Sequence, residues 1–295
     1  MTRKQPLPLA LLFVSLVCAL GASAQIPAAW TTQFPPFRIA GDATRGLYYV
    51  GSEDLASYLI VTPAGNILIN SNLGSSPQQI RKSVESLGFH WADIRILLIS
   101  HAHYDHCAGS AEILRETHAQ YEVMAEDVSV VQSGGHTDFN YATHKTMWFP
   151  PAHVDRPLHD GDAVALGAVT LTAHRTAGHT KGATTWTFDL PGSGRTLHVV
   201  IVGSPNVNPG YKLVHNTRYP QIAADYKHQF EVLKKLPCDI FLGAHGGYFD
   251  LAEKYPRFKA GDHNAFIDPA GYQAFIADRQ QAFETELTKQ SAAQH

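Results

Sequence analysis

The most informative stretch of the sequence is residues 96–106, which read Ile-Leu-Leu-Ile-Ser-His-Ala-His-Tyr-Asp-His. The unbroken apolar run at its start predicts a buried strand. Because side chains two positions apart on an extended chain point the same way, His101 and His103 can meet at one metal ion. Asp105 and His106 follow where the chain is expected to turn into the next helix, so they can face a second, adjacent metal ion. Three histidines and an aspartate at the exit of an apolar strand predict a metal site.

Two further histidines stand in turns of small residues. His179 lies in the stretch Thr-Ala-Gly-His-Thr-Lys-Gly, and His245 lies in Leu-Gly-Ala-His-Gly-Gly after another apolar run. Flanking glycines allow the tight turns that bring a backbone close to a metal ion. For either histidine alone, a hydrogen-bonded loop residue is an equally good interpretation. Other histidines, such as His118 and His263, lack this setting and are expected to be structural or exposed.

Strands and helices alternate around these motifs. Short β-rich runs separated by turns that contain glycine predict an early meander of hairpins. Apolar residues at helical spacing predict the helices between later strands. The predicted strands are residues 47–50, 58–61, 67–69, 96–99, 164–172, 184–188, 198–202 and 240–242, and the predicted helices are residues 77–87, 108–117, 222–236 and 269–288. The pattern favours an α/β fold with two packed sheets and helices on the outside.

Composition limits the classes of protein to which the chain can belong. Of 295 residues 44% are hydrophobic and 17% are charged, which supports a packed core and argues against a disordered chain. The net charge of −3 argues against a nucleic-acid partner. Three cysteines are too few for a disulfide scaffold, and Cys107 and Cys238 are expected to be free thiols.

The first 24 residues have the pattern of an export signal. Two basic residues precede a short apolar run, and Ala22 and Ala24 have the small side chains that a signal peptidase requires. The run is short for a transmembrane anchor. We therefore expect a signal peptide over residues 1–24 and a single mature domain over residues 25–295, located in the periplasm or secreted, without a membrane or nucleic-acid partner and monomeric.

The order His-x-His-x-Asp-His, Gly-His and a distal His resembles the zinc-ligand series of the metallo-β-lactamase superfamily, whose fold is an αββα sandwich of two mixed sheets. Many members carry a bridging Asp after the strand that corresponds to residues 198–202, but this chain has Ser204 there. That serine, with His245 as the last ligand, resembles the subclass B3 metallo-β-lactamases over nearly all of the mature chain. Residues 54–60 and 208–213 also carry the resemblance.

The resemblance implies a role for each matching residue. His101, His103 and His179 match the first zinc site, and Asp105, His106 and His245 match the second, so two Zn²⁺ per chain are implied. Asp105 is also implied to orient the attacking water. Ser204 matches a substrate-binding position, and Asn206 and Asn208 in the same loop are weaker candidates for substrate contact, with turn formation as the alternative. Some relatives join the Cys238 position to a second cysteine by a disulfide, but this chain has Tyr272 at the second position.

The implied activity is hydrolysis of the β-lactam amide bond of penicillins, cephalosporins and carbapenems, which confers antibiotic resistance. A zinc-bound hydroxide attacks the lactam without an acyl-enzyme. Consistently, the chain contains neither Ser-x-x-Lys nor Gly-x-Ser-x-Gly, so it has no recognisable serine nucleophile motif. Two alternatives remain at this point: another hydrolase of the superfamily, such as a lactonase or thioesterase, and a non-enzymatic periplasmic zinc-binding protein.

Overall fold

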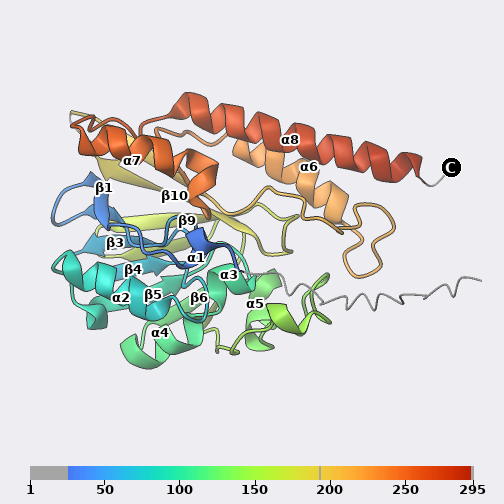
Figure 1. Ribbon diagram of the computed structural model, residues 1–295, viewed down its shortest axis with the longest axis horizontal. Coiled ribbons are helices and arrows are strands. Elements are labelled where there is room, and N and C mark those ends of the chain that lie inside the picture. The colour runs from blue at the N-terminus through green and yellow to red at the C-terminus, as the bar shows by residue number, and fades with distance from the viewer. Residues whose placement is uncertain (1–25, 193, 294–295) are drawn as a thin grey trace, which may run out of the picture.

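A computed structural model describes residues 26–192 and 194–293 of the protein, so the predicted signal peptide over residues 1–24 lies outside the described residues. Two mixed β-sheets stack face to face, and helices cover their outer faces (Figure 1). This arrangement confirms the predicted αββα sandwich. No helix among the described residues is long and apolar enough to cross a membrane.

The first sheet has seven strands in sequence order, β1 to β7. Strands β1 to β4 form an antiparallel meander, and β5, β6 and β7 then add in parallel. The strands are β1 (Phe37–Gly41), β2 (Gly46–Tyr49), β3 (Tyr58–Thr62), β4 (Gly65–Ile69), β5 (Ile94–Leu98), β6 (Gln120–Met124) and β7 (Arg156–Leu158). The meander was predicted from its turn residues, and the apolar β5 occupies the predicted interior position.

The second sheet has five strands in the order β12-β11-β10-β9-β8. The strands are β8 (Ala163–Leu166), β9 (Val169–Arg175), β10 (Thr184–Pro191), β11 (Thr196–Val202) and β12 (Ile240–Gly243). The prediction of one strand over residues 164–172 was wrong, because a tight turn at Gly167 divides it into the β8–β9 hairpin. Gly167 has a φ of 59°, a left-handed conformation that favours glycine.

Apolar side chains fill the space between the sheets. Tyr49, Tyr58 and Ile67 of the first sheet belong to the same buried cluster as Leu171 and Trp186 of the second. The alternation of inward and outward side chains along each strand explains this layer. Burial of apolar surface between the sheets is therefore the main contribution to their stacking.

Helices cover both outer faces (Figure 1). The helices associated with the seven-stranded sheet are α2 (Pro77–Ser86), α4 (Ser110–Thr117) and α5 (Ala125–Gln132), and those on the other side are α6 (Ile222–Leu233), α7 (Leu251–Lys259) and α8 (Pro269–Ala292). Two shorter helical turns, α1 (Ala28–Thr31) and α3 (Tyr104–Cys107), lie near each other in front of the sheets. Helices α5 and α7 have no counterpart in the sequence-based prediction.

The two sheets are tied together where β5 ends. The Trp186 indole Nε1 donates a hydrogen bond to the Ile99 carbonyl at 3.1 Å, and the Thr184 amide donates to the Ser100 carbonyl at 2.8 Å. A Cβ on Gly203, after β11, would lie 3.3 Å from the Ser100 carbonyl oxygen, so the second sheet also approaches the end of β5 closely here. This contact fixes the predicted metal-binding stretch, which begins at residue 101, against the second sheet.

Candidate metal centre

The backbone that follows β5 changes to a helical turn at Tyr104. His101 and His103 therefore precede the turn, whereas Asp105 and His106 lie in it. His103 is extended, with φ −104° and ψ 153°, and the rings of His101 and His103 lie 4.9 Å apart. The prediction that these two histidines can converge is confirmed, because their donor atoms lie within 4.8 Å of each other. The helical turn begins earlier than expected, at Tyr104 in α3, so Asp105 and His106 themselves lie on helical backbone.

His179 reaches the first pair from the turn between β9 and β10. The donor atoms of His101, His103 and His179 all lie within 4.8 Å of one another, and His103 Nδ1 is 3.1 Å from His179 Nε2. Gly178, with φ 140°, makes the turn, and a Cβ there would lie 2.8 Å from the Tyr226 ring. Only glycine fits this conformation and this space, so the sequence Gly-His is explained by the local backbone.

A second group of donors adjoins the first. His106 Nε2 lies 3.2 Å from Asp105 Oδ2 and 3.2 Å from His245 Nε2, and His245 Nε2 lies 3.7 Å from Asp105 Oδ2. The His101, Asp105 and His106 donors also lie within 4.8 Å of one another, so the two groups share a border. His245 follows β12 of the second sheet, whereas Asp105 and His106 follow β5 of the first.

Burial keeps four imidazoles of this centre neutral, those of His101, His103, His106 and His179. Desolvation lowers the pKa of His103 to about 4 and, together with the charge of His103, lowers the pKa of His179 to about 3. Desolvation also lowers the pKa of His101 and of His106. A neutral imidazole has a free lone pair, which is the form that binds a metal ion.

Hydrogen bonds at the outer ring nitrogens fix which nitrogen faces inward. His179 Nδ1 donates to the Asn206 carbonyl at 2.8 Å, and His245 Nδ1 donates to Asp54 Oδ2 at 2.8 Å. The Nε2 lone pair of each ring is then left for a metal ion. His101 Nε2 is buried and has no hydrogen-bond partner in the part of the chain that the structure describes.

These residues fit zinc. Imidazole and carboxylate donors suit it, and two nitrogens on one tetrahedral zinc at about 2.0–2.1 Å lie roughly 3.3 Å apart. The spacings of 3.1 Å between His103 and His179 and 3.2 Å between His106 and His245 are close to that value. A cation would also give His101 Nε2 the partner that it lacks.

Two residues beside the second group had no role in the sequence-based prediction. Asp54 binds His245, accepts the Gly247 amide at 3.1 Å through Oδ1, and accepts the Trp30 indole at 3.0 Å through Oδ2. Trp30 also lies against the His245 ring, with centroids 5.8 Å apart. The position of Asp54 within the family-like stretch at residues 54–60 was a signal, but its direct contact with His245 depends on the tertiary fold.

The predicted substrate-binding residues form a network behind the metal ligands. Ser204 Oγ lies 3.1 Å from the Tyr248 hydroxyl, which also accepts a hydrogen bond from Asn206 Nδ2 at 2.8 Å. Arg279 of α8 donates to Asn206 Oδ1 at 3.2 Å, which fixes the orientation of that amide. Ser204 is 1% exposed and does not line the pocket, whereas Asn206 does.

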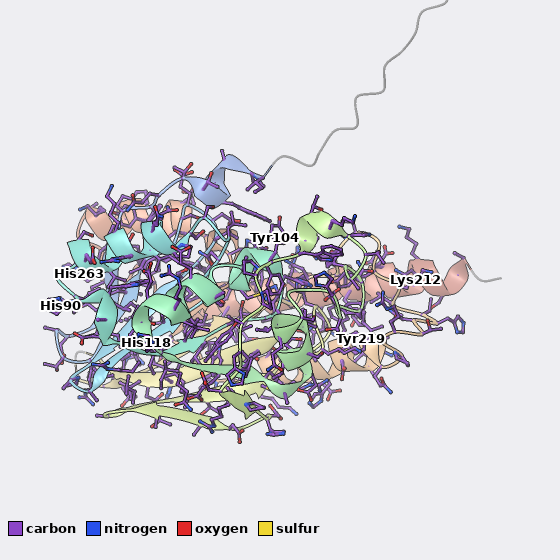
Figure 2. The ribbon with its side chains drawn as sticks, turned by 90° about the horizontal axis from the view of Figure 1, so that it is seen from below. His90, Tyr104, His118, Lys212, Tyr219 and His263 are labelled. Atoms are coloured by element: carbon purple, nitrogen blue, oxygen red, sulfur yellow. The ribbon has the colours of Figure 1, made fainter. Side chains whose placement is uncertain are left out.

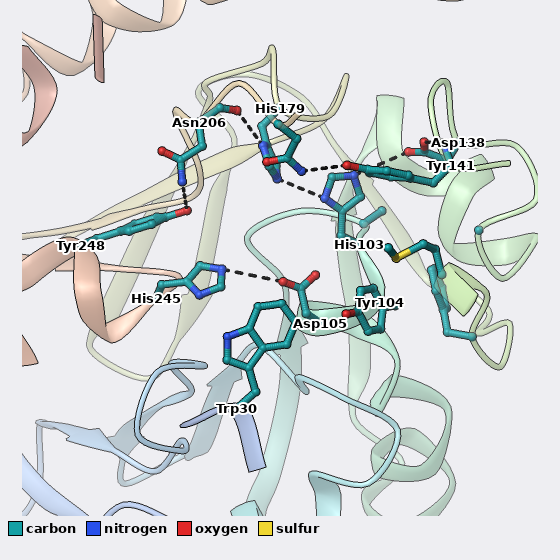
Figure 3. A pocket seen from close by; sticks show the side chains of 15 residues that line it. Trp30, His103, Tyr104, Asp105, Asp138, Tyr141, His179, Asn206, His245 and Tyr248 are labelled. Atoms are coloured by element: carbon teal, nitrogen blue, oxygen red, sulfur yellow. Dashed lines mark hydrogen bonds and ion pairs between the residues drawn. The ribbon is translucent and has the colours of Figure 1, made fainter. Parts of the chain in front are cut away.

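Four of the predicted metal ligands border a cavity of about 300 Å³ (Figure 3). His103, Asp105, His179 and His245 lie on its wall, and Asn208 donates to the Tyr141 hydroxyl at 3.0 Å at its edge. The aromatic residues that line it are Trp30, Tyr104, Tyr141, Phe149 and Tyr248. The cavity therefore combines an apolar wall with a polar, metal-binding floor, as small-molecule sites commonly do.

The remaining predictions about histidine and cysteine agree with the structure. His118 and His263 are exposed, and both lie well away from the pocket residue Tyr104 (Figure 2). Cys107 and Cys238 are free thiols. Burial raises the pKa of Cys107 well above its ordinary value, so the thiol stays protonated and acts as a small buried side chain.

Comparison with known proteins points to one family. A model described as the metallo-beta-lactamase superfamily matches residues 55–245. The native FEZ-1 metallo-beta-lactamase from Legionella gormanii is 55% identical, with a TM-score of 0.86 over 88% of this chain and 98% of that chain.

Two further solved structures carry a subclass in their descriptions. BJP-1, a subclass B3 metallo-beta-lactamase of Bradyrhizobium japonicum, is 33% identical, with a TM-score of 0.83 over 91% of this chain and 99% of that chain. LRA-12, a class B3 di-zinc metallo-beta-lactamase from an Alaskan soil metagenome, is 35% identical, with a TM-score of 0.83 over 88% of this chain and 96% of that chain. With the two adjoining ligand groups and Ser204 in place of a bridging Asp, these matches lead to one conclusion: the chain belongs to the metallo-β-lactamase superfamily, in its subclass B3.

Proposed function

We infer that this protein hydrolyses the β-lactam amide bond of penicillins, cephalosporins and carbapenems with two zinc ions and thereby confers antibiotic resistance. The observation that carries this inference is the pair of adjoining donor groups on the wall of one cavity. His101, His103 and His179 would hold the first zinc. Asp105, His106 and His245 would hold the second. FEZ-1, BJP-1 and LRA-12 are all described as metallo-beta-lactamases, which supports the same reaction here.

The chain supplies the setting for an attack by water. Two bound zinc ions would supply a water that loses its proton at about pH 7. They would also supply positive charge beside the lactam carbonyl oxygen and the amide nitrogen. Three neutral imidazoles in the first group leave the full metal charge uncompensated. Their burial excludes competing solvent from the reacting centre.

Asp105 is the residue best placed to orient that water. Burial by itself would raise its pKa, but its interactions with His106 and His245, which include a hydrogen bond with His106, outweigh this effect and lower the pKa well below its ordinary value. The carboxylate therefore stays ionised and can accept a hydrogen bond from a water in the cavity.

The substrate would lie against the aromatic wall of the cavity. Asn206 and Asn208 line it, and Ser204 is joined to it through the Tyr248 hydroxyl. We infer that these three residues help to orient the β-lactam near the second metal group. The aromatic side chains of Trp30 and Tyr141 offer apolar contact to substituents on the lactam.

The setting of the reaction follows from the predicted signal peptide. Residues 25–295 would act as a single mature domain, in the periplasm or outside the cell, after removal of residues 1–24. A small β-lactam is the expected partner, the expected state is a monomer, and neither a nucleic acid nor a membrane is expected as a partner.

Carbapenem hydrolysis by the purified mature chain tests the proposal. We expect turnover with zinc present, loss of turnover with a chelator, and recovery when zinc is restored. An acyl lactone and a thioester serve as comparison substrates in the same assay. Faster hydrolysis of either, with no β-lactam turnover, would indicate the alternative hydrolase, and tight zinc binding without any turnover would indicate a zinc-binding protein.

A further inference from the structure

Asp127 is a buried carboxylate that the proposed reaction does not use. It lies in the first turn of α5, its side chain has no exposed surface, and it does not line the cavity. Burying a carboxylate is costly unless hydrogen bonds satisfy it. The groups that satisfy Asp127 therefore indicate why it is there.

All three hydrogen bonds to Asp127 come from the loops that carry the first group of metal ligands. Oδ2 accepts the Ala102 amide at 2.9 Å and the Thr180 hydroxyl at 2.7 Å, and Oδ1 accepts the Gly182 amide at 2.9 Å. Ala102 stands between His101 and His103, and Thr180 directly follows His179. One carboxylate thus accepts hydrogen bonds from the backbone between His101 and His103 and from the residue next to His179.

The fit around Asp127 is close. A Cβ on Gly182 would lie 2.8 Å from the Asp127 Cβ, so the His179 loop passes directly against this side chain. The bond between the Thr184 amide and the Ser100 carbonyl joins the same two segments at the strand ends. Beyond that point, the carboxylate bridges Ala102 of one loop to Thr180 and Gly182 of the other.

We propose that Asp127 is a positioning residue that aligns the two ligand loops, so that His101, His103 and His179 meet in the geometry of a preformed zinc site. Hydrogen bonds to an ionised acceptor are short and directional, and outer contacts of this kind hold metal ligands in place. The inference rests on the metal centre of the proposed function, but it does not depend on which substrate is hydrolysed.

The test is Asp127→Asn in the full mature chain. An amide of the same size cannot accept hydrogen bonds at both ends, so at least one loop contact is lost. We expect zinc affinity at the tighter site to fall about 10- to 100-fold, measured by competition with a chromogenic chelator. The visible absorption of the cobalt-substituted protein should also change, because it reports the ligand geometry.

Asp155→Asn is the matched control. Asp155 Oδ2 accepts the Tyr121 amide at 2.8 Å, far along the chain from the metal ligands, so its loss tests an ordinary structural contact. The proposal predicts that only Asp127→Asn lowers zinc affinity, while both variants change the melting temperature of the metal-free protein. Unchanged zinc affinity and an unchanged cobalt spectrum in Asp127→Asn would overturn the proposal.

Thr180→Val covers the case in which Asp127→Asn does not fold. It removes one donor and keeps the carboxylate with its two backbone contacts. We expect zinc affinity to fall several-fold relative to Asp155→Asn, and equal affinity in the two variants would overturn the proposal. Zinc titration also separates this inference from the proposed function, since a chain that binds zinc normally but hydrolyses no β-lactam contradicts only the latter.

Discussion

At the scale of single residues, Ser204 occupies the position at which many relatives have a bridging aspartate. Its hydroxyl lies 3.1 Å from the Tyr248 hydroxyl, and neither set of predicted zinc ligands includes it. Ser204→Ala should therefore keep both zinc ions. If Ser204 orients the carboxylate of the substrate, the lost hydrogen bond to that charged group costs roughly 1.5–3 kcal/mol, so turnover should fall about 10- to 100-fold.

Zinc content and hydrolysis rate, measured together, check the Ser204 prediction. His179→Ala is the comparison, because loss of a direct ligand should reduce both the zinc content and the rate far more. If Ser204→Ala loses a zinc ion, Ser204 is itself a ligand, and its use to distinguish this subclass fails.

Asp54 has a separate effect, on the second donor group. Its carboxylate accepts from His245 Nδ1 and so keeps the inward Nε2 free for a metal ion. Asp54→Asn should weaken zinc binding at the second site about 10- to 100-fold, with the first site little changed. Zinc titration of the variant checks this prediction, and two unaltered binding steps would contradict it.

The sequence indicated the clustered donor residues better than the residues that hold them in place. His101, His103, Asp105 and His106 are adjacent in the chain, so their spacing alone indicates the chemistry. Asp127 acts by accepting hydrogen bonds from two backbone amides and one hydroxyl that are more than 20 positions away in the sequence. A local sequence pattern cannot indicate bonds of this kind. The contact of Asp54 with His245 could not be predicted for the same reason, since the two residues are far apart in the sequence.

At the scale of helices and strands, prediction depended on how clearly apolar residues repeat. The apolar β5 and β12 were found because a buried strand is apolar throughout. Helix α5, whose sequence is Ala-Glu-Asp-Val-Ser-Val-Val-Gln, was missed because its β-branched residues favour strands and its apolar face is weak. Tertiary contacts, including those of Asp127, stabilise it as a helix.

Helix α8 provides a test of stability that should leave the metal centre intact. The Tyr272 hydroxyl donates to the Leu233 carbonyl at the end of α6 at 2.6 Å, and Tyr272 occupies the place where some relatives have a disulfide cysteine. Tyr272→Phe should lower the free energy of unfolding by about 1 kcal/mol. We expect a decrease of about 2–4 °C in the melting temperature with unchanged zinc affinity, measured by calorimetry and zinc titration. An unchanged melting temperature would contradict this account.

At the scale of the whole molecule, both sheets contribute ligands to one centre. Because zinc would bind only the folded arrangement, it should stabilise the native state by about 4 kcal/mol when free zinc exceeds its dissociation constant about 1,000-fold. Removing zinc with a chelator should therefore lower the melting temperature, and restoring zinc should reverse the change. Equal melting temperatures with and without zinc would argue against a site that joins the sheets.

The metal-free protein should lose stability in mild acid. Burial lowers the pKa of His103 to about 4 and of His179 to about 3, whereas an unfolded histidine titrates near pH 6.5. Between about pH 6.5 and 4 the unfolded chain binds more protons, so the free energy of unfolding falls as the pH falls through this window. Urea unfolding of the metal-free protein at several pH values checks this, and a midpoint that is constant from pH 7 to 4.5 would contradict it.

The division of the ligands between the sheets also sets an order of events during biosynthesis. The four ligands after β5 leave the ribosome first, His179 follows, and His245 comes only after β12, the last strand of the described chain. A product that terminates between residues 180 and 240 carries His101, His103 and His179 of the first group but lacks His245 of the second. Formation of the second donor group thus requires synthesis of β12 and His245, so chains that terminate before this point would be distinguishable by their metal content.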